Sequence, residues 1–396
     1  MAYKTRNYND FNDYLNTYSN IDNCDIDVVI LDTFLIENSN TSKKWSIMKP
    51  FLFIRIVTAN GTEGWGEAHT LLGDDNLTIN YIHELAEIIK LQPMSPWKFF
   101  SLINSHEIKS SDMNYCAARS AIEMALWDIY GKQSGKPLNN LIGKSTDKYV
   151  PVYANIWSNQ YQSDEAIINK AVSVINDGFL AIKIYPLQGR NVTQAAYFVK
   201  NLRSTIGDNI EILVDLACPD NERDAIDLEP LIIEYKPYWY EEPTDGQNIK
   251  LLSMIKGQSK LAIVTGESQC DINHFKAILD ANAADILNPE IAAIGGITKL
   301  LEIAVLADEC EVKISPHCWN SMSIAMAVML HLCSIMPNSD KAEIFPDYFR
   351  CSNQFMDYNF KLYQGKMQVP KNAGIGVSLD VKKLQETTSN IRTTFK

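Results

Sequence analysis

Short apolar segments alternate with amphipathic segments along the chain from Lys148 onward. The apolar segments have the length and composition of buried strands, and they cover 149–155, 180–185, 210–216, 238–241, 262–267, 285–290, 312–317 and 342–344. The segments between them, including 192–206, 271–281, 298–309 and 321–335, carry apolar residues at helical spacing. Eight strands that alternate with helices favour a parallel β/α barrel over a doubly wound open sheet.

The first part of the chain has a different pattern. Segments 25–31 and 50–57 are typical of antiparallel strands, and 79–90 and 117–134 have helical periodicity. We therefore predict an α+β domain over 1–147, with an N-terminal extension over 1–20. The barrel domain is predicted over 148–345 and a C-terminal segment over 346–396.

Composition narrows the class of protein. The 396 residues carry a formal net charge of −12 and are 46% hydrophobic, which indicates a globular protein. Without a basic cluster, a nucleic-acid partner is not expected. The sequence lacks an apolar run of membrane-spanning length and a recognisable signal peptide, so we expect a cytoplasmic protein with no membrane partner. Its eight scattered cysteines are expected to be reduced thiols.

Polar residues recur at the carboxyl ends of the predicted strands. They follow one another at intervals of 23 to 27 residues, about one β/α unit, and are Asp215, Glu241, Glu267, Glu290, His317 and Glu343. Single residues of this kind often begin solvated loops. Six in register predict a common site, because these strand ends converge at one mouth of a barrel.

Three consecutive carboxylates in this series, Asp215, Glu241 and Glu267, would repel one another unless a cation lies between them. Carboxylate oxygens suit Mg²⁺, with Mn²⁺ as the alternative. A solvated acidic rim is the competing interpretation, and it leaves the regular spacing unexplained.

Lys183 and Tyr185 lie two residues apart on one predicted strand, so both point into the barrel. An ammonium beside a phenol favours the phenolate, and together the two side chains can form a base. The pair alone is more typical of a packed tyrosine beside a lysine that extends towards solvent. Opposite a metal site, the base becomes the better interpretation.

His317 and Glu290 belong to neighbouring predicted strands, and a carboxylate bonded to an imidazole is typical of acid or base catalysis. The remaining histidines are expected to be structural or solvated. Three of them, His83, His106 and His274, are predicted on surface helices.

Several motifs in order along the chain resemble the enolase superfamily, and within it the mandelate racemase and muconate lactonizing group. The motifs occupy 64–68 (GWGEA), 121–132 (AIEMALWDIYGK), 240–243 (YEEP), 266–267 (GE), 295–298 (GGIT) and 374–377 (GIGV). The resemblance implies a (β/α)7β barrel under an α+β cap that the C-terminal segment completes. It also implies Mg²⁺ held by Asp215, Glu241 and Glu267, which stabilises an ene-diolate formed by a Lys or His base.

The sequence departs from the usual family pattern in three places. Tyr185 stands where the family often has a proton-abstracting lysine, Glu290 replaces the usual aspartate beside the histidine, and Ala217 replaces a frequent asparagine. Some acid-sugar dehydratases of the group resemble this arrangement. A racemase that needs two matched bases is therefore less favoured than a dehydratase, which needs one base and one acid.

Our hypothesis from the sequence is a Mg²⁺-dependent acid-sugar dehydratase, a hydro-lyase, with the diacid galactarate as the first substrate. Tyr185 with Lys183 would remove the α-proton. His317, oriented by Glu290, would act as the acid, or as the base from the other face. Tyr115 is an alternative acid, and Glu343 would bond the substrate carboxylate.

Four points stay open at this level. Loops 37–44 and 70–76 are expected to set specificity; Lys43 or Lys44 could meet a distal carboxylate, but a solvated lysine pair is the favoured interpretation. A homo-oligomer is expected without a defined number of subunits. A racemase or epimerase is the rival at the same site. A non-catalytic protein that binds sugar acids is the rival of a different class.

Overall fold

The structure, a computed structural model, describes residues 25–36, 50–69, 75–104, 111–143, 148–157, 163–318, 323–347, 354–356, 358–388 and 390–395. None of the helices within these ranges is long and apolar enough to cross a membrane.

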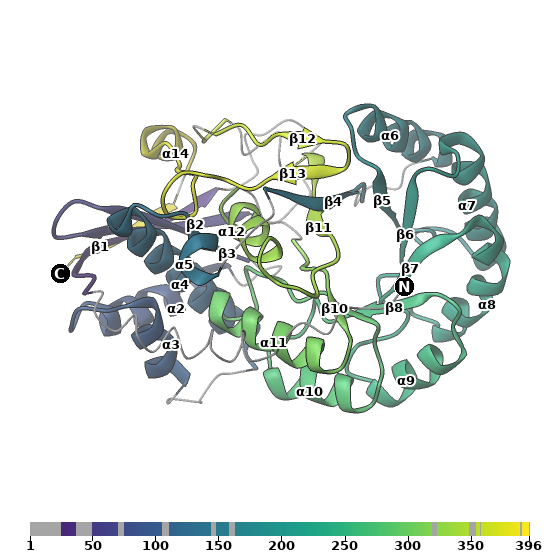
Figure 1. Cartoon of the computed structure of the whole chain (residues 1–396), viewed down its shortest axis with the longest axis horizontal. Coiled ribbons are helices and arrows are strands. Elements are labelled where there is room, and N and C mark those ends of the chain that lie inside the picture. The colour runs from purple at the N-terminus through teal and green to yellow at the C-terminus, as the bar shows by residue number, and fades with distance from the viewer. Residues whose placement is uncertain are drawn as a thin grey trace.

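The cap contains a four-stranded antiparallel sheet in the order β14-β1-β2-β3. Its strands are β1 (Val28–Ile36), β2 (Phe51–Thr58), β3 (Glu63–Ala68) and β14 (Asn390–Phe395). Strand β14 pairs with β1, so the chain's last described strand lies beside its first (Figure 1). The expectation that the C-terminal segment contributes to the cap is met by this strand.

Four helices accompany the cap sheet: α2 (Asp75–Ile89), α3 (Pro96–Asn104), α4 (Met113–Ser134) and α5 (Leu138–Ile142). Helix α4 begins four residues before the apolar pattern starts, because the carboxylate of Asp112 accepts hydrogen bonds from two backbone N–H groups of its first turn. Strand β3 lies directly against α4. A Cβ atom at Gly66 would stand 1.9 Å from the carbonyl oxygen of Ala121, so only glycine permits this contact.

The barrel alternates strands and helices through the middle of the chain (Figure 1). Its elements are β4 (Tyr149–Asn155), α6 (Asp164–Asn176), β5 (Ala181–Ile184), α7 (Val192–Ile206), β6 (Glu211–Asp215), α8 (Glu222–Ile232), β7 (Pro237–Glu241), α9 (Ile249–Gln258), β8 (Ala262–Thr265), α10 (Ile272–Asp280), β9 (Ile286–Leu287), α11 (Ile297–Glu309), β10 (Lys313–Ile314), α12 (Ser323–Cys333) and β11 (Ala342–Ile344). The (β/α)7β barrel with an α+β cap is confirmed, and the open sheet is not the fold.

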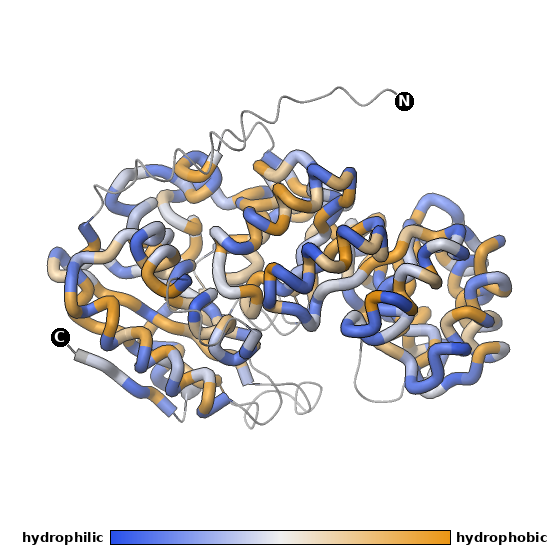
Figure 2. Tube along the Cα trace, turned by 90° about the horizontal axis from the view of Figure 1, so that it is seen from below, coloured by the Kyte–Doolittle hydropathy of each residue, from blue (hydrophilic) through white to orange (hydrophobic). Residues whose placement is uncertain are grey.

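The barrel strands are parallel neighbours from β4 through β10, and β11 pairs with β4 on the other side. The hydroxyl of Ser315 donates to the carbonyl oxygen of Lys341 at 2.7 Å, which joins the end of β10 to the start of β11. Hydrophobic and hydrophilic residues alternate along the helical coils in Figure 2, the pattern of helices with one buried face.

The C-terminal segment also reaches the barrel. Strands β12 (Leu362–Tyr363) and β13 (Lys366–Gln368) form a hairpin, and β13 pairs antiparallel with β4. The segment then forms helix α14 (Val381–Thr387) and strand β14 of the cap sheet. The last fifty residues therefore contact both parts of the protein, beyond the expected completion of the cap.

His83 lies on α2, and its side chain is buried. Its ring nitrogens meet the hydroxyls of Thr33 on β1 and Thr394 on β14. Of the two expected roles, structural or solvated, the structure gives His83 the structural one, because β14 at the end of the chain lies beside it. His106 lies outside the described residues.

Candidate active site

The polar residues at the barrel mouth come from six successive strands. Asp215 and Glu241 end β6 and β7, and Glu343 lies within β11. Glu267, Glu290 and His317 follow β8, β9 and β10, and a parallel bridge joins Glu290 to His317. Because parallel strands present their carboxyl ends on one side, side chains spread over 129 positions of sequence gather here.

Lys183, on β5, is the centre of this group. Its Nζ lies 3.2 Å from Asp215 Oδ2, 2.8 Å from Glu241 Oε1 and 2.9 Å from Glu343 Oε1. The side chain is completely buried and does not extend towards solvent. Burial alone would lower the pKa of Lys183, but Glu241 and Glu343 raise it well above its usual value. Lys183 is therefore a fixed cation that holds three carboxylates.

The carboxylates at the mouth carry more negative charge than the neighbouring cationic side chains can compensate. Burial raises the pKa of Glu241 well above its usual value; Lys183 opposes this, and Asp215 and Glu267 add to it. Burial likewise raises the pKa of Asp215 to about 6, against the effect of Lys183. Glu241 Oε2 is buried and has no hydrogen-bond partner among the described residues. An uncompensated carboxylate oxygen in an acidic cluster is the environment that a bound cation satisfies.

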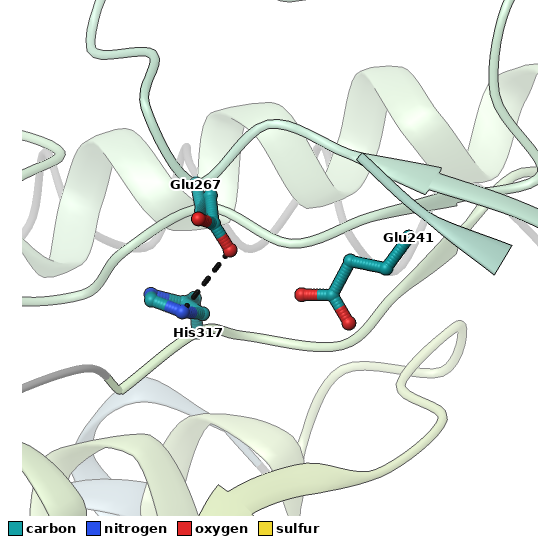
Figure 3. A group of neighbouring side chains, drawn as sticks. All are labelled: Glu241, Glu267 and His317. Carbon is teal, nitrogen blue, oxygen red and sulfur yellow. Dashed lines mark ion pairs between the residues drawn. The ribbon is translucent and has the colours of Figure 1, made fainter. Parts of the chain in front are cut away.

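Figure 3 shows Glu241 and Glu267 facing His317, with an ion pair between Glu267 and the imidazole. These three residues offer ligand atoms that all lie within 4.8 Å of one another. Asp215 is not a member of that set; its Oδ2 contacts Lys183, and its Oδ1 accepts the N–H of Ala217 at 2.8 Å. Glu267 is the more open of the two glutamates, with 27% of its side chain exposed.

His317 is surrounded by carboxylates. Its Nδ1 lies 2.9 Å from Glu290 Oε2, and its Nε2 lies 3.1 Å from Glu267 Oε2 and 3.4 Å from Glu343 Oε2. Burial alone would lower the pKa of His317, but Glu267, Glu343 and the bond to Glu290 raise it to about 10. Both ring nitrogens can donate to carboxylates in the imidazolium form. The predicted pairing of Glu290 with His317 is present in the structure.

Tyr185 does not have the environment that the sequence suggested. Burial raises its pKa well above the usual value, and the opposing effect of Lys183 does not outweigh burial and the carboxylates. The Lys183 Nζ lies 5.9 Å from the centre of the Tyr185 ring, while its short contacts are to carboxylates. Lys183 lowers the pKa of Tyr185 in the predicted direction, but its short contacts are to carboxylates from other strands, and the role of the pair as a base stays a prediction.

Two buried asparagines of the site were missed. Asn155 ends β4 and donates to the hydroxyl of Tyr185 at 2.9 Å and to Glu343 Oε1 at 2.7 Å. Asn288 donates to Glu241 Oε1 at 2.9 Å. Both follow the strand-end rule that selected the charged residues, and an extension of that rule to amides would have found them.

Tyr115 lies on the first turn of α4, where its ring packs edge-on against Tyr81 at 5.4 Å between centres. Its expected role as an alternative acid stays a prediction. The specificity loops fall mostly outside the described residues: 37–44, with Lys43 and Lys44, lies there entirely, and 70–76 is described only from Asp75.

Comparisons with known proteins identify the family of the chain. Residues 166–383 match the family described as enolase C-terminal domain-like, and residues 31–143 match the mandelate racemase / muconate lactonizing enzyme N-terminal domain. The chain belongs to the mandelate racemase / muconate lactonizing enzyme group. The family resemblance drawn from the motifs is confirmed.

Relatives within the group include named hydro-lyases. The chain is 25% identical to D-gluconate dehydratase of Thermoproteus tenax over 90% of this chain and 73% of that protein. A crystal structure of an enolase from the Sargasso Sea environmental genome is 36% identical, with a TM-score of 0.89 over 93% of this chain and 98% of that one. L-Talarate dehydratase from Polaromonas sp. JS666, complexed with Mg and L-glucarate, has 22% identity and a TM-score of 0.79 over 93% and 99% of the two chains. The prediction of an enzyme of the hydro-lyase class is confirmed.

Proposed function

We propose that this enzyme is a Mg²⁺-dependent sugar-acid dehydratase, which converts a sugar acid into a 2-keto-3-deoxy acid and water. One observation carries the proposal. A phenol and a carboxylate-bound imidazole, Tyr185 after β5 and His317 after β10, flank the same acidic cluster. Such a site offers two proton-transferring groups beside a cluster that suits a divalent cation.

Asp215, Glu241 and Glu267 would hold the metal ion. The orphan oxygen Glu241 Oε2 and the raised pKa values of Glu241 and Asp215 support a cation at this place. His317 Nε2 lies close enough to join the ligand set, but hard carboxylate oxygens suit Mg²⁺ better than an imidazole does. When bound, Mg²⁺ supplies positive charge that stabilises the second negative charge developing on the substrate carboxyl group.

The protein's own residues would carry the protons. In its phenolate form, which the charge of Lys183 and of a bound divalent cation would favour, Tyr185 takes the proton from the carbon next to the substrate carboxylate and becomes the neutral phenol. The Nε2–H of His317 gives its proton to the β-hydroxyl, so that the C–O bond breaks and water leaves. The bond of its Nδ1 to Glu290 orients the imidazole, which supports the acid role. Lys183 holds Glu241 and Glu343 in place throughout.

The substrate is proposed as a class. D-gluconate is a monoacid, and the L-glucarate bound in the talarate dehydratase structure is a diacid, so the relatives support sugar acids of both kinds. Galactarate, the first choice from the sequence, stays a candidate among these.

The proposal is tested by incubation of the protein with D-gluconate, L-glucarate and galactarate, each with Mg²⁺ and then with a chelator. We expect a semicarbazide-reactive keto product from at least one acid with Mg²⁺, and its loss on chelation. Tyr185→Phe and His317→Asn should each abolish the product while the protein stays folded. Exchange of the α-proton with solvent deuterium in the absence of keto product would select a racemase or epimerase instead.

A further inference from the structure

Asn155 is a neutral side chain among charged ones at the barrel mouth. It is the last residue of β4, and its side chain has no solvent exposure. The neighbouring strands are β5, which Tyr185 follows directly, and β11, which carries Glu343. The mechanism proposed above assigns it no proton and no metal contact.

The amide of Asn155 bonds to three partners. Its Nδ2 donates one hydrogen to the Tyr185 hydroxyl at 2.9 Å and the other to Glu343 Oε1 at 2.7 Å. Its Oδ1 accepts the backbone N–H of Trp157 at 2.8 Å. Every hydrogen-bonding direction of the NH2 group is thus used.

These partners fix which way the amide faces. With the amide turned over, its NH2 group would meet the N–H of Trp157, and its oxygen would meet the carboxylate of Glu343. Both contacts are repulsive, so the backbone of the loop after β4 keeps the NH2 group directed at Tyr185. Because the phenol oxygen accepts a hydrogen from Asn155, it keeps one fixed position before and after it takes a proton.

The same amide connects the two proton-transferring groups. Glu343 Oε1 accepts from Asn155, and Glu343 Oε2 lies 3.4 Å from His317 Nε2. A continuous series of contacts therefore runs from Tyr185 through Asn155 and Glu343 to His317. The backbone N–H of Cys318 donates to Glu343 Oε2 at 2.8 Å, which anchors that carboxylate within the series.

We infer that Asn155 is a positioning residue for the dehydration, which holds the phenol oxygen of Tyr185 at a fixed place relative to Glu343 and His317. The inference rests on the proposed function. The amide donates to the phenol oxygen without adding charge, whereas an aspartate would place a further carboxylate beside Glu343. Hydrogen bonds donated to the phenol oxygen also favour the form that accepts the proton.

The test compares Asn155→Ala and Asn155→Asp with the wild type, on the sugar acid that the wild type dehydrates. We expect kcat to fall on the order of 10²-fold in Asn155→Ala, as after loss of one preorganised donor, and further in Asn155→Asp. The KM should change little, and addition of Mg²⁺ should raise the melting temperature of each variant as it does for the wild type. A merely structural role would not separate kcat from these two measurements.

Asn139→Ala is the matched control. Asn139 is a buried asparagine outside the barrel mouth, whose Nδ2 donates to the Ser334 hydroxyl at 3.3 Å. We expect this variant to lose stability and to keep the wild-type kcat.

Three outcomes would overturn the inference: a kcat close to the wild-type value in Asn155→Asp, loss of the Mg²⁺ response together with kcat, or failure of both Asn155 variants to fold. If the wild type converts none of the sugar acids, the proposed function fails first. If it converts one and the Asn155 variants match it, only the inference fails.

Discussion

Two groups of buried carboxylates lie at the barrel mouth and at the seam where the cap meets the barrel. The seam carboxylates are Glu67 on β3 and Glu123 and Asp128 on α4. They are as deeply buried as Glu241 and Glu343 at the mouth. The two regions differ in the partners that satisfy these groups.

At the seam the partners are mainly backbone N–H groups of packed segments. Asp128 accepts from Trp65 N at 3.0 Å and from Ile375 N at 2.9 Å, and it pairs with Lys132 at 2.7 Å. Glu123 Oε1 accepts the N–H of Thr298 at 2.9 Å, at the first turn of α11. Glu67 Oε2 accepts from Ala325 N at 2.9 Å.

At the mouth the carboxylates share one lysine and one histidine. Their further donors include the backbone N–H groups of Ala217 and Cys318 and the amides of Asn155 and Asn288. Backbone donors at the seam join distant segments and fix the domains, whereas the mouth gathers a surplus of carboxylates around one lysine. An unpaired buried oxygen does not by itself separate the two regions, because Glu123 Oε2 at the seam and Glu241 Oε2 at the mouth both have no hydrogen-bond partner among the described residues. Burial of an acid therefore does not by itself indicate a functional site. The nature of its partners separates the two regions.

The largest expected effect is at the mouth. Glu241→Gln should lower kcat on the order of 10³-fold, because it removes a proposed metal ligand and one charge of the cluster. The folded protein should keep or gain stability without Mg²⁺, since the repulsion with Asp215 and Glu267 is relieved. Keto-product assays and melting curves with and without Mg²⁺ check this. A substantial loss of stability in the absence of metal would contradict the difference between the mouth and the seam.

Asp128→Asn makes the converse change at the seam. We expect the free energy of unfolding to fall by about 3 kcal/mol, because the Lys132 ammonium loses its partner and one of two buried backbone N–H groups loses its acceptor. Urea denaturation measures this loss, and kcat per folded enzyme should stay at the wild-type value. A fall in kcat without a loss of stability would place Asp128 with the mouth carboxylates.

The contribution of His331 to stability depends on pH, and this dependence tests the comparison between the two regions. Its Nδ1 accepts the N–H of Asn139 and its Nε2–H donates to the Ile375 carbonyl at 3.1 Å, so the seam holds it neutral. Burial lowers its pKa to about 4. In the unfolded chain His331 takes up a proton near pH 6.5, whereas in the folded protein it does so only near pH 4. The contribution of neutral His331 to the free energy of unfolding is therefore complete above pH 6.5 and is lost as the pH falls towards 4.

The loss for His331 should total about 3 kcal/mol, at about 1.4 kcal/mol per pKa unit. Unfolding in urea at a series of pH values, compared with His331→Gln, isolates this contribution. We expect a flatter pH dependence in the variant. Parallel curves for the two proteins would show that His331 does not titrate as described.

The smallest effect is expected at the surface. Arg223 and Asp227 form an exposed i,i+4 pair on α8, 2.9 Å apart. Asp227→Asn should change the free energy of unfolding by no more than about 0.5 kcal/mol, because water screens the pair. Urea denaturation in parallel with Asp128→Asn measures both. Equal losses in the two variants would show that burial and backbone donors do not account for the stability of the seam.

The local elements followed from the sequence to a large degree. Strands β4 and β11 and helix α7 have the predicted bounds, because their apolar spacing is regular and turn residues border them. The shorter strands β9 and β10 cover only two residues each within the longer apolar segments. An apolar residue indicates a buried position and not a hydrogen-bonded strand position. Residues beyond the last paired residue of a strand are buried as deeply as those within the strand.

By itself the sequence determined the alternation of strands and helices and, through polar residues at regular strand ends, the composition of the acidic mouth. Only the tertiary structure decided the partners of each group: Lys183 bonds carboxylates from three other strands instead of the Tyr185 hydroxyl, Asn155 takes that hydroxyl, and β14 buries His83. Periodicity is a local property of the chain, while a hydrogen bond between residues 188 positions apart, such as that of Asn155 with Glu343, depends on how the barrel closes.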